Sequence, residues 1–236
     1  MDPEALLAPL EREGIRLGLA DVGRLLDVLG RPQWRSGQVL IAGTNGKGST
    51  AALLASILEA AGYTTGLYTS PHLERVEERV RLSGRAIAPE RLATALERIV
   101  AAAERLLGHP PTYFEAVTAA AFLLFADAEV DFELMEVGLG GRLDATNLAE
   151  PELALVTAIG LDHTEHLGVT TAAIAQEKAG IFRPGVPALG WVEDAAAAAT
   201  LARVAGEVGA VWRAVDHEAR WQREGWNWDG QWGELE

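Results

Sequence analysis

The sequence contains no cysteine, and only two of its 20 basic residues are lysines. A chain without cysteine forms neither disulfides nor thiolate zinc sites, and this composition fits a reducing compartment. No apolar run reaches the roughly 18 residues of a membrane-spanning helix, and no basic segment followed by an apolar one opens the chain. We therefore expect a cytoplasmic protein without a membrane span or an export signal.

Positive charge is also scarce, since 34 acidic residues outnumber the 20 basic ones and the formal net charge is −14. This balance argues against a broad nucleic-acid-binding surface, which needs clustered lysine and arginine. A local phosphate site remains compatible with it, because backbone N–H groups and a helix N-terminus can form one. With 236 residues, 49% of them hydrophobic, the chain is long enough for one large α/β domain or two small ones.

Strand-like and helical patterns alternate along the chain. This alternation predicts an α/β fold with a doubly wound, mostly parallel sheet and helices on both faces, in one domain over residues 1–236. The expected strands cover residues 39–42, 64–69, 131–137, 153–159, 186–189 and 210–215. The expected helical segments cover residues 4–29, 50–61, 89–107, 112–125 and 194–208, with one more from about residue 171.

The tail, residues 217–236, differs in composition from the rest of the chain. Trp221, Trp226, Trp228 and Trp232 stand there among polar residues and glycines. The alternation around Gly225 predicts a hairpin. Its tryptophans either pack on the edge of this domain or await a part of the protein outside these residues.

A glycine-rich turn follows the first expected strand. It leads into a helix, whose positive N-terminal end favours an anion. We expect it to bind the phosphates of a nucleotide through Thr44, Asn45, Gly46, Lys47, Gly48 and Ser49. The usual phosphate-loop pattern has a glycine in place of Ile41 and a hydroxyl residue in place of Gly48. A glycine-rich turn with a solvated lysine is the alternative.

The two lysines, Lys47 and Lys178, are exceptional in a chain that otherwise uses arginine. Lysine is a compact charge on a flexible stem, and its pKa shifts readily on burial, whereas arginine is a flat, permanently charged fork. We infer that both positions require an amine.

Polar side chains follow three further expected strands: Ser70, Glu136 and His163. Ligands of open α/β sheets bind beyond the carboxyl ends of the strands, so these groups are expected near the glycine-rich turn. Such an oxygen-rich site suits magnesium bridging two phosphates, although imidazole is an unusual magnesium ligand. Each residue also has a structural alternative, as a turn hydroxyl, a solvated strand end or a loop histidine.

Several motifs together give the sequence a resemblance to the folylpolyglutamate and dihydrofolate synthases of the Mur ligase family. They occur in the order found in that family and cover about residues 40–185. The matching stretches are Ala42–Ser49, Ser70-Pro71-His72-Leu73, Glu78-Arg79-Val80, Tyr113-Phe114-Glu115, Glu136–Asn147, Gly160-Leu161-Asp162-His163-Thr164 and Glu177–Ile181. The Ser-Pro-His-Leu stretch and Asp144-Ala145-Thr146-Asn147 resemble the folate branch more than the cell-wall branch.

The resemblance implies an ATP-dependent ligase whose fold is that of the Mur ligase central domain. The γ-phosphate passes to a carboxylate, and the amino group of L-glutamate then displaces phosphate to form an amide. Lys47 is implied to be catalytic and Ser70, Glu136 and His163 to bind Mg²⁺. The pterin of dihydropteroate or of a reduced folate is implied to lie along Tyr113, Phe114, Glu115, Ala116, Leu143, Asp144 and Ala145.

The resemblance gives Lys178 a further role, as a carbamylated lysine that ligates a second magnesium ion and takes part in catalysis. Carbamylation requires a neutral amine, and arginine cannot replace lysine in it. The alternative is that Lys178 pairs with Glu177 or with another neighbour on the same helix.

Family members continue beyond this length, into a stretch that contacts adenine and a C-terminal domain that binds glutamate. We therefore expect the chain to be a monomeric N-terminal ATP-binding part that is inactive without that domain in cis. Two alternatives stay open: a P-loop kinase or NTPase, which needs no amine acceptor, and a non-catalytic nucleotide-binding module, which is insensitive to Lys178. The choice between dihydropteroate and a reduced folate also stays open.

Overall fold

The computed structural model describes residues 2–14, 16–215, 219–222 and 225–228, the last two ranges by their backbone alone. An eight-stranded sheet in the order β4-β3-β2-β5-β1-β6-β7-β8 lies at its centre. Six strands run parallel, and β3 and β4 are antiparallel at one edge. The strands are β1 Gly37–Ala42, β2 Thr65–Tyr68, β3 Val80–Leu82, β4 Arg85–Ala86, β5 Phe132–Glu136, β6 Leu153–Val156, β7 Pro187–Gly190 and β8 Val211–Ala214. The expected doubly wound, mostly parallel sheet is confirmed.

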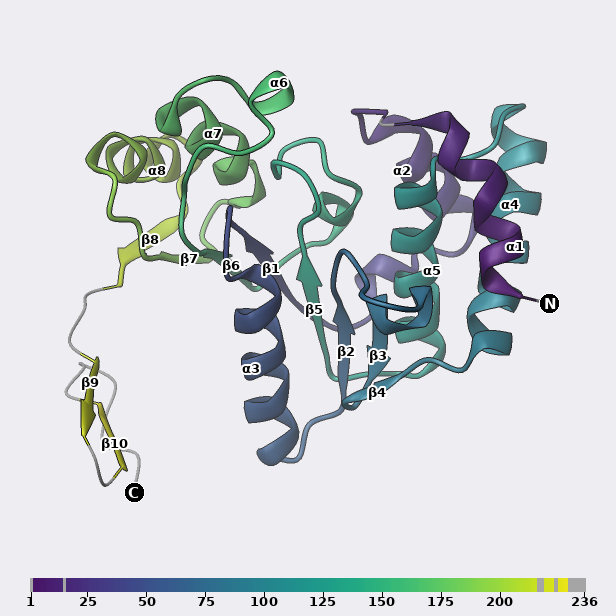
Figure 1. The fold of residues 1–236 in the computed structure, drawn as a ribbon, viewed down its shortest axis with the longest axis horizontal. Coiled ribbons are helices and arrows are strands. Elements are labelled where there is room, and N and C mark those ends of the chain that lie inside the picture. The colour runs from purple at the N-terminus through teal and green to yellow at the C-terminus, as the bar shows by residue number, and fades with distance from the viewer. Residues whose placement is uncertain (1, 15, 216–218, 223–224, 229–236) are drawn as a thin grey trace.

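The helices gather at the two ends of the sheet. Figure 1 shows α1, α2, α4 and α5 together at one end and α7 and α8 at the other. The α-helices are α1 Pro3–Leu7, α2 Ala20–Val28, α3 Lys47–Ala60, α4 Pro89–Leu107, α5 Tyr113–Asp127, α6 Thr164–Leu167, α7 Thr171–Lys178 and α8 Ala195–Val208. Short 3₁₀ turns cover Ala8–Glu13, Pro32–Trp34, Val76–Arg79, Ala145–Leu148 and Ala179–Ile181.

Two apolar cores lie on opposite faces of the sheet, because successive residues of a strand point to opposite sides. Leu40 of β1 belongs to the larger core, which α1, α2, α4, α5, α7 and α8 share. Its neighbours Val39 and Ile41 belong to a small core beneath α3, with Ala51 and Ala55 of that helix. The central strand β1 is therefore buried on both faces, as its continuous apolar sequence predicts.

One expectation for the order of elements is wrong, and two short strands were not expected. The helical segment over 4–29 is interrupted, because Gly14 and Gly18 adopt φ values of 65° and 149° that break the helix. The charged segment before the 89–107 helix contains β3 and β4, which are only three and two residues long and too short to give a recognisable pattern.

The hairpin expected in the tail is present in the backbone, as β9 (Ala219–Gln222) paired antiparallel with β10 (Gly225–Trp228). The packing expected for its tryptophan side chains, and Trp232 altogether, lie outside the residues that the structure describes. Among the described helices, none combines the length and the apolar character of a membrane span.

Candidate functional site

The glycine-rich turn lies at the carboxyl end of β1, and α3 begins directly after it at Lys47. Gly46 has a φ of 83°, in the left-handed region that favours glycine. At Gly43 a Cβ atom would lie 1.8 Å from the Oγ1 atom of Thr157, so only glycine fits. The backbone is therefore free to fold as a tight turn at the N-terminus of α3, an anion-binding arrangement.

The loop after β6 holds this turn in place. The Thr157 hydroxyl donates to the carbonyl of Asn45 at 2.7 Å. The backbone N–H of Thr44 donates to Ala158 O at 2.7 Å, and the N–H of Gly160 donates to Thr44 Oγ1 at 3.1 Å. These contacts join the loops of two adjacent strands, so the turn of residues 43–49, which we call the phosphate-binding turn after its predicted role, is held in place by the protein itself.

Glu136, the last residue of β5, is only 5% exposed and reaches the same turn. Its Oε2 atom accepts the backbone N–H of Ser70 at 3.0 Å. A Cβ atom on Gly48 would lie 3.2 Å from Oε2, which explains why glycine follows the lysine here. Burial raises the pKa of the Glu136 carboxyl, while the Ser70 N–H and the charge of Lys47 oppose the shift. The carboxylate therefore lies beside the phosphate-binding turn.

The polar side chains beside the turn suit a magnesium ion that takes its remaining ligands from water and from phosphate oxygens. Within the described residues, no three His, Cys, Asp or Glu side chains converge as a metal cluster. Glu136 offers a carboxylate next to the turn, and Ser70, whose backbone N–H donates to that carboxylate, carries a hydroxyl. Magnesium keeps several waters and binds phosphate oxygens, so one carboxylate and one hydroxyl are a sufficient protein contribution.

His163 follows β6 and precedes α6, at the same edge of the sheet. Its imidazole is half exposed and lies 3.7 Å from the carboxylate of Asp162. In the described part of the chain it forms no hydrogen bond with Ser70 or Glu136. Its metal-binding role therefore stays a prediction.

Lys178, the last residue of α7, is 5% exposed. Its Nζ atom donates to the carbonyl of Gly43 at 2.8 Å. Burial lowers the pKa of the amine to about 8, and the positive charge of Lys47 adds to this effect. A substantial neutral fraction at physiological pH follows, as carbamylation requires. The pairing partner of Glu177 is Arg142, at 3.0 Å, so the alternative in which Lys178 pairs with Glu177 is not what the structure shows.

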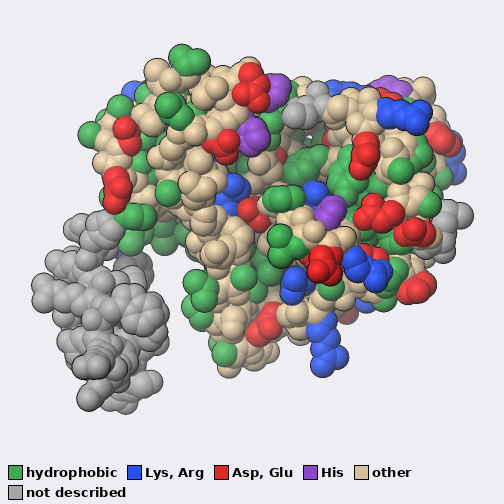
Figure 2. Space-filling model, viewed as in Figure 1, with side chains coloured by type: hydrophobic (Ala, Val, Ile, Leu, Met, Phe, Trp, Pro, Cys, Tyr) green, Lys and Arg blue, Asp and Glu red, His purple; other side chains and the backbone are tan. Residues whose placement is uncertain are grey.

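A cavity of about 260 Å³ adjoins these residues. Five residues of the expected pterin-binding stretches line it together with Ser70: Phe114, Glu115, Leu143, Asp144 and Ala145. Figure 2 shows the surface hollowed between the two halves of the molecule, with acidic, basic and histidine side chains around the hollow. Ser70 thus connects the cavity that these expected stretches line with Glu136 beside the turn.

Two residues of the expected pterin-binding stretches lie elsewhere. Ala116 is completely buried in the larger core, because α5 turns only one of its faces to the cavity. Tyr113 is half-buried, with the Arg79 guanidinium 5.2 Å from its ring centre, and does not line the cavity. The boundaries expected for this stretch therefore extend beyond the residues that face the cavity.

Asp144 lines the cavity, but both oxygens of its carboxylate already accept hydrogen bonds from the protein. It accepts N–H groups from Gly138, Leu139 and Thr146 at 2.8–3.0 Å and the hydroxyl of Thr146 at 2.6 Å. Burial raises its pKa, and these donors oppose the shift. Asp144 therefore shapes the loop after β5 and presents it to the cavity.

Sequence reasoning missed several lining residues, among them Arg16, Leu17 and Arg79. Arg16 lies in the break between α1 and α2 and approaches Glu115 at 3.8 Å. The glycines at 14 and 18, which interrupt the helical periodicity, are a signal that could have identified this segment as a loop. Arg79 belongs to the Glu78-Arg79-Val80 stretch that carries the family resemblance, but the sequence gives it no specific role.

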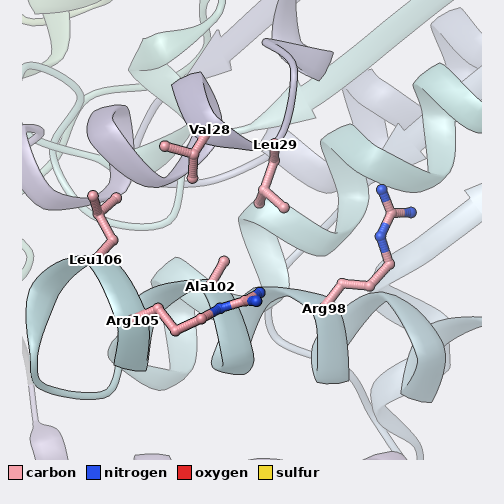
Figure 3. Close-up of a pocket in the computed structure, with 6 residues that line it drawn as sticks. All are labelled: Val28, Leu29, Arg98, Ala102, Arg105 and Leu106. Carbon is pink, nitrogen blue, oxygen red and sulfur yellow. The ribbon is translucent and has the colours of Figure 1, made fainter.

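A separate groove between α2 and α4 is lined by Val28, Leu29, Arg98, Ala102, Arg105 and Leu106 (Figure 3). It carries no hydroxyl, carboxylate or imidazole among its lining residues. It is also remote from the strand ends that carry the groups above. We therefore place the candidate site at the phosphate-binding turn.

Comparison with known proteins identifies one family. A model described as "Mur ligase middle domain" matches residues 41–208. The dihydrofolate synthase/folylpolyglutamate synthase of Escherichia coli (strain K12) is 45% identical over 205 residues, which are 87% of this chain and 47% of that protein. The chain thus spans about half the length of the curated relatives that it matches.

Solved structures give the same result. E. coli FolC in complex with DHPP and ADP is similar with a TM-score of 0.91 and 39% identity, over 100% of this chain and 57% of that one. A bifunctional folylpolyglutamate synthase/dihydrofolate synthase with Mn, AMPPNP and L-glutamate bound is similar with a TM-score of 0.89 and 38% identity, over 100% and 57% of the two chains.

Proposed function

Because this chain belongs to the Mur ligase family, through its middle domain, we propose that it is the ATP-, magnesium- and pterin-binding part of an amide-forming ligase. The reaction adds L-glutamate to dihydropteroate, to a reduced folate or to both. One observation carries the proposal: Ser70 lines the cavity, and its N–H also donates to Glu136 beside the phosphate-binding turn. A substrate in the cavity would therefore have its carboxylate next to the transferable phosphate.

The relatives support the choice of ligands. One solved structure holds DHPP and ADP, and another holds Mn, AMPPNP and L-glutamate. A nucleotide and a divalent metal thus bind to proteins of this fold. For this chain we assign the nucleotide phosphates to Thr44, Asn45, Gly46, Lys47, Gly48 and Ser49 and the metal to Ser70, Glu136 and His163.

The chemistry follows from these positions. A carboxylate oxygen of the substrate attacks the γ-phosphorus of ATP, the bond to the β,γ-bridging oxygen breaks, and ADP leaves an acyl phosphate behind. The amino group of glutamate then attacks the acyl carbon, loses a proton and expels phosphate. Lys47 would neutralise the charge that builds on the transferring phosphoryl group. Bound magnesium would supply further screening of that charge.

We propose in addition that Lys178 is carbamylated in the working enzyme. The neutral amine adds to CO₂, a nitrogen–carbon bond forms and one proton is released, which leaves a carboxylate on a long arm. Its burial and lowered pKa support this reaction. The carboxylate would lie close to the phosphate-binding turn, because the amine already contacts Gly43.

The test is ADP release by the protein that carries this chain, with ATP and either dihydropteroate or tetrahydrofolate, with and without glutamate. We expect sustained turnover only with glutamate, and a product heavier by one glutamyl residue. Equal turnover without an amine acceptor would instead indicate a kinase or NTPase and would contradict the proposal. We expect the 236 residues by themselves to bind ATP without glutamate-dependent turnover.

A further inference from the structure

Two segments of the candidate site pack directly on each other. The loop after β5, residues 138–149, contributes three residues to the cavity wall: Leu143, Asp144 and Ala145. The end of α7 and the turn after it, residues 177–183, carry Lys178, which donates to the phosphate-binding turn. We call these two segments the cavity loop and the lysine segment. The way they pack on each other sets where Lys178 lies relative to the cavity wall.

The backbones of the two segments are in contact. A Cβ atom on Gly180 would lie 2.5 Å from the Cα atom of Arg142. One on Gly141 would lie 2.9 Å from the backbone oxygens of Glu177 and Lys178. The N–H of Arg142 also donates to the carbonyl of Glu177 at 3.0 Å. Only glycine at positions 141 and 180 therefore lets the cavity loop approach the lysine segment this closely.

Asn147 and Arg183 join the two segments by reciprocal hydrogen bonds. Asn147, in the cavity loop, is 7% exposed, and its Nδ2 atom donates to the carbonyls of Arg142 and Gly180, each at 3.1 Å. Arg183, in the lysine segment, donates from Nη2 to the carbonyl and to Oδ1 of Asn147, both at 2.9 Å. Its Nη1 atom donates to the carbonyls of Gly180 and Phe182 in its own segment. The guanidinium thus holds both segments at once.

The surroundings of Arg183 indicate that its shape matters more than its charge. In the described part of the chain its side chain is half-buried, and its hydrogen bonds go to carbonyl oxygens and not to a carboxylate. Burial lowers the pKa of the guanidinium, and the charge of Glu150 opposes the shift. A cation in such a place costs free energy unless its donors are all used. A planar fork of several donors can span two segments, which a single ammonium group cannot do as well.

We propose that Asn147 and Arg183 are positioning residues of the ligation reaction, which hold the amine of Lys178 beside the phosphate-binding turn and fix the cavity loop relative to it. Neither residue contacts the nucleotide or the reacting carboxylate in this assignment, because both act through Lys178 and the cavity loop. For turnover the inference rests on the proposed function, whereas the placement of Lys178 is a property of the chain itself.

A second arginine offers a matched control, because it bridges the same two segments at the surface. Arg142 pairs with Glu177 at 3.0 Å, but its side chain is 54% exposed. Exposed ion pairs contribute little to stability or to geometry. The same substitution, arginine to glutamine, can therefore be compared at 183 and at 142.

The scarcity of lysine allows a direct test of placement, since Lys47 and Lys178 are the two lysines of the chain. Acetic anhydride acylates both amines in the 236-residue chain in bicarbonate-free buffer, and peptide mass spectrometry follows the two rates separately. Because Lys178 is only 5% exposed, it should react about tenfold or more slowly than Lys47 in the parent chain. Arg183→Gln should remove most of that difference, whereas Arg142→Gln should preserve it.

Kinetics of the longer protein that carries this chain test the role in the reaction. Arg183→Gln should raise the KM for dihydropteroate or tetrahydrofolate and lower kcat, with a loss of about 10²-fold in kcat/KM, the effect of a misplacement of about 1 Å. The KM for ATP should stay unchanged, because Thr157 and the loop after β6 hold the phosphate-binding turn independently. A purely structural role would instead reduce the amount of folded enzyme, and so kcat alone. Arg142→Gln should leave all three constants at their parent values.

Asn147→Ser removes both amide arms and is the second variant, which replaces Arg183→Gln if circular dichroism shows that protein to be unfolded. Equal acylation of Lys47 and Lys178 in the parent overturns the proposal, as does a rate ratio that the folded variant leaves unchanged. Altered acylation with unchanged KM for the pterin substrate overturns the positioning role in the reaction. A parent protein without glutamate-dependent turnover contradicts the proposed function instead, and the acylation rates then decide the placement of Lys178.

Discussion

The Nζ atom of Lys178 lies 2.8 Å from the carbonyl oxygen of Gly43, so the last residue of α7 donates a hydrogen bond to the first residue of the phosphate-binding turn. The amine is buried, and its pKa is lowered to about 8. This contact gives Lys178 a structural role as an amine and places any carbamate formed on it close to the turn. The two roles are separable by experiment.

Lys178→Arg should retain the positive charge while abolishing the carbamate. In the longer protein that carries this chain, we expect glutamate-dependent turnover to fall by about 10²–10³, the range found when one preorganised electrostatic group is removed from an active site. In ¹³C-bicarbonate buffer, a carbamate signal should be present in the parent protein and absent from the variant. Arg142→Lys is the control, because Arg142 pairs with Glu177 beside this residue and should leave the signal intact. Retained turnover in Lys178→Arg would rule out the carbamate role.

The sequence predicts those parts of the site that follow from the order of strands in a parallel sheet. It does not predict contacts that depend on how distant segments pack. Lys47, Ser70 and Glu136 converge because the carboxyl ends of parallel strands share one edge of the sheet. The contact between Lys178 and Gly43 joins residues 135 positions apart and leaves no local pattern. The lining role of Arg16 likewise depends on how a loop between two helices packs against α5, which periodicity cannot show.

Arg79→Ala should weaken pterin binding without affecting ATP. Arg79 lines the cavity, donates to His72 Nδ1 at 2.9 Å and lies 5.2 Å from the ring centre of Tyr113. Loss of one charged hydrogen-bonding group of this kind costs about 1.5–3 kcal/mol, so we expect the pterin dissociation constant to rise about tenfold to a hundredfold. Isothermal titration of each ligand measures the two affinities separately.

Arg75→Ala is the matched control for that variant. Arg75 pairs with Glu77 at 2.9 Å, its side chain is 65% exposed, and it is not among the residues that line the cavity. It should change neither affinity. An equal loss of ATP and pterin binding in Arg79→Ala would contradict a role confined to the pterin cavity.

Gly48→Ala should impair the phosphate-binding turn specifically. The added Cβ would lie 3.2 Å from Glu136 Oε2, so the carboxylate must move away from the turn and from Ser70. We expect a loss of ATP affinity of about tenfold, equivalent to 1.4 kcal/mol. Gly206→Ala is the control, because Gly206 also lies in a helix and a Cβ there meets nothing within 4 Å. That variant should bind ATP normally and gain up to about 1 kcal/mol of stability. Normal ATP affinity in Gly48→Ala would show that Glu136 accommodates the methyl group.

Stability should fall as pH rises toward neutrality because of Glu133, which lies far from the site. Its carboxyl is completely buried and accepts hydrogen bonds from Ser36 Oγ at 2.6 Å and Gln38 Nε2 at 2.5 Å. Burial raises the pKa of this carboxyl from 4.5 to about 7, and the two donors oppose the shift. The folded state therefore holds a proton that the unfolded chain has already released, so the contribution of Glu133 to stability is fully present below pH 4.5 and is lost as pH rises through 7.

A shift of this size corresponds to a loss of about 3 kcal/mol at most, and Glu133→Gln should remove that part of the pH dependence. Urea unfolding of both proteins at pH 5 and pH 8 measures the difference: the parent should lose stability between the two values and the variant should lose less.

Asp131→Asn is the control of opposite sign, because the N–H and hydroxyl of Thr64 hold the pKa of the Asp131 carboxyl below its usual range. Its contribution is present above the unfolded pKa and is lost on acidification, so Asp131→Asn should be destabilised at pH 5 and pH 8 alike. A parent protein whose Glu133 contribution is the same at both pH values would mean that the carboxyl is already ionised at pH 5, held by the two donors against the cost of burial.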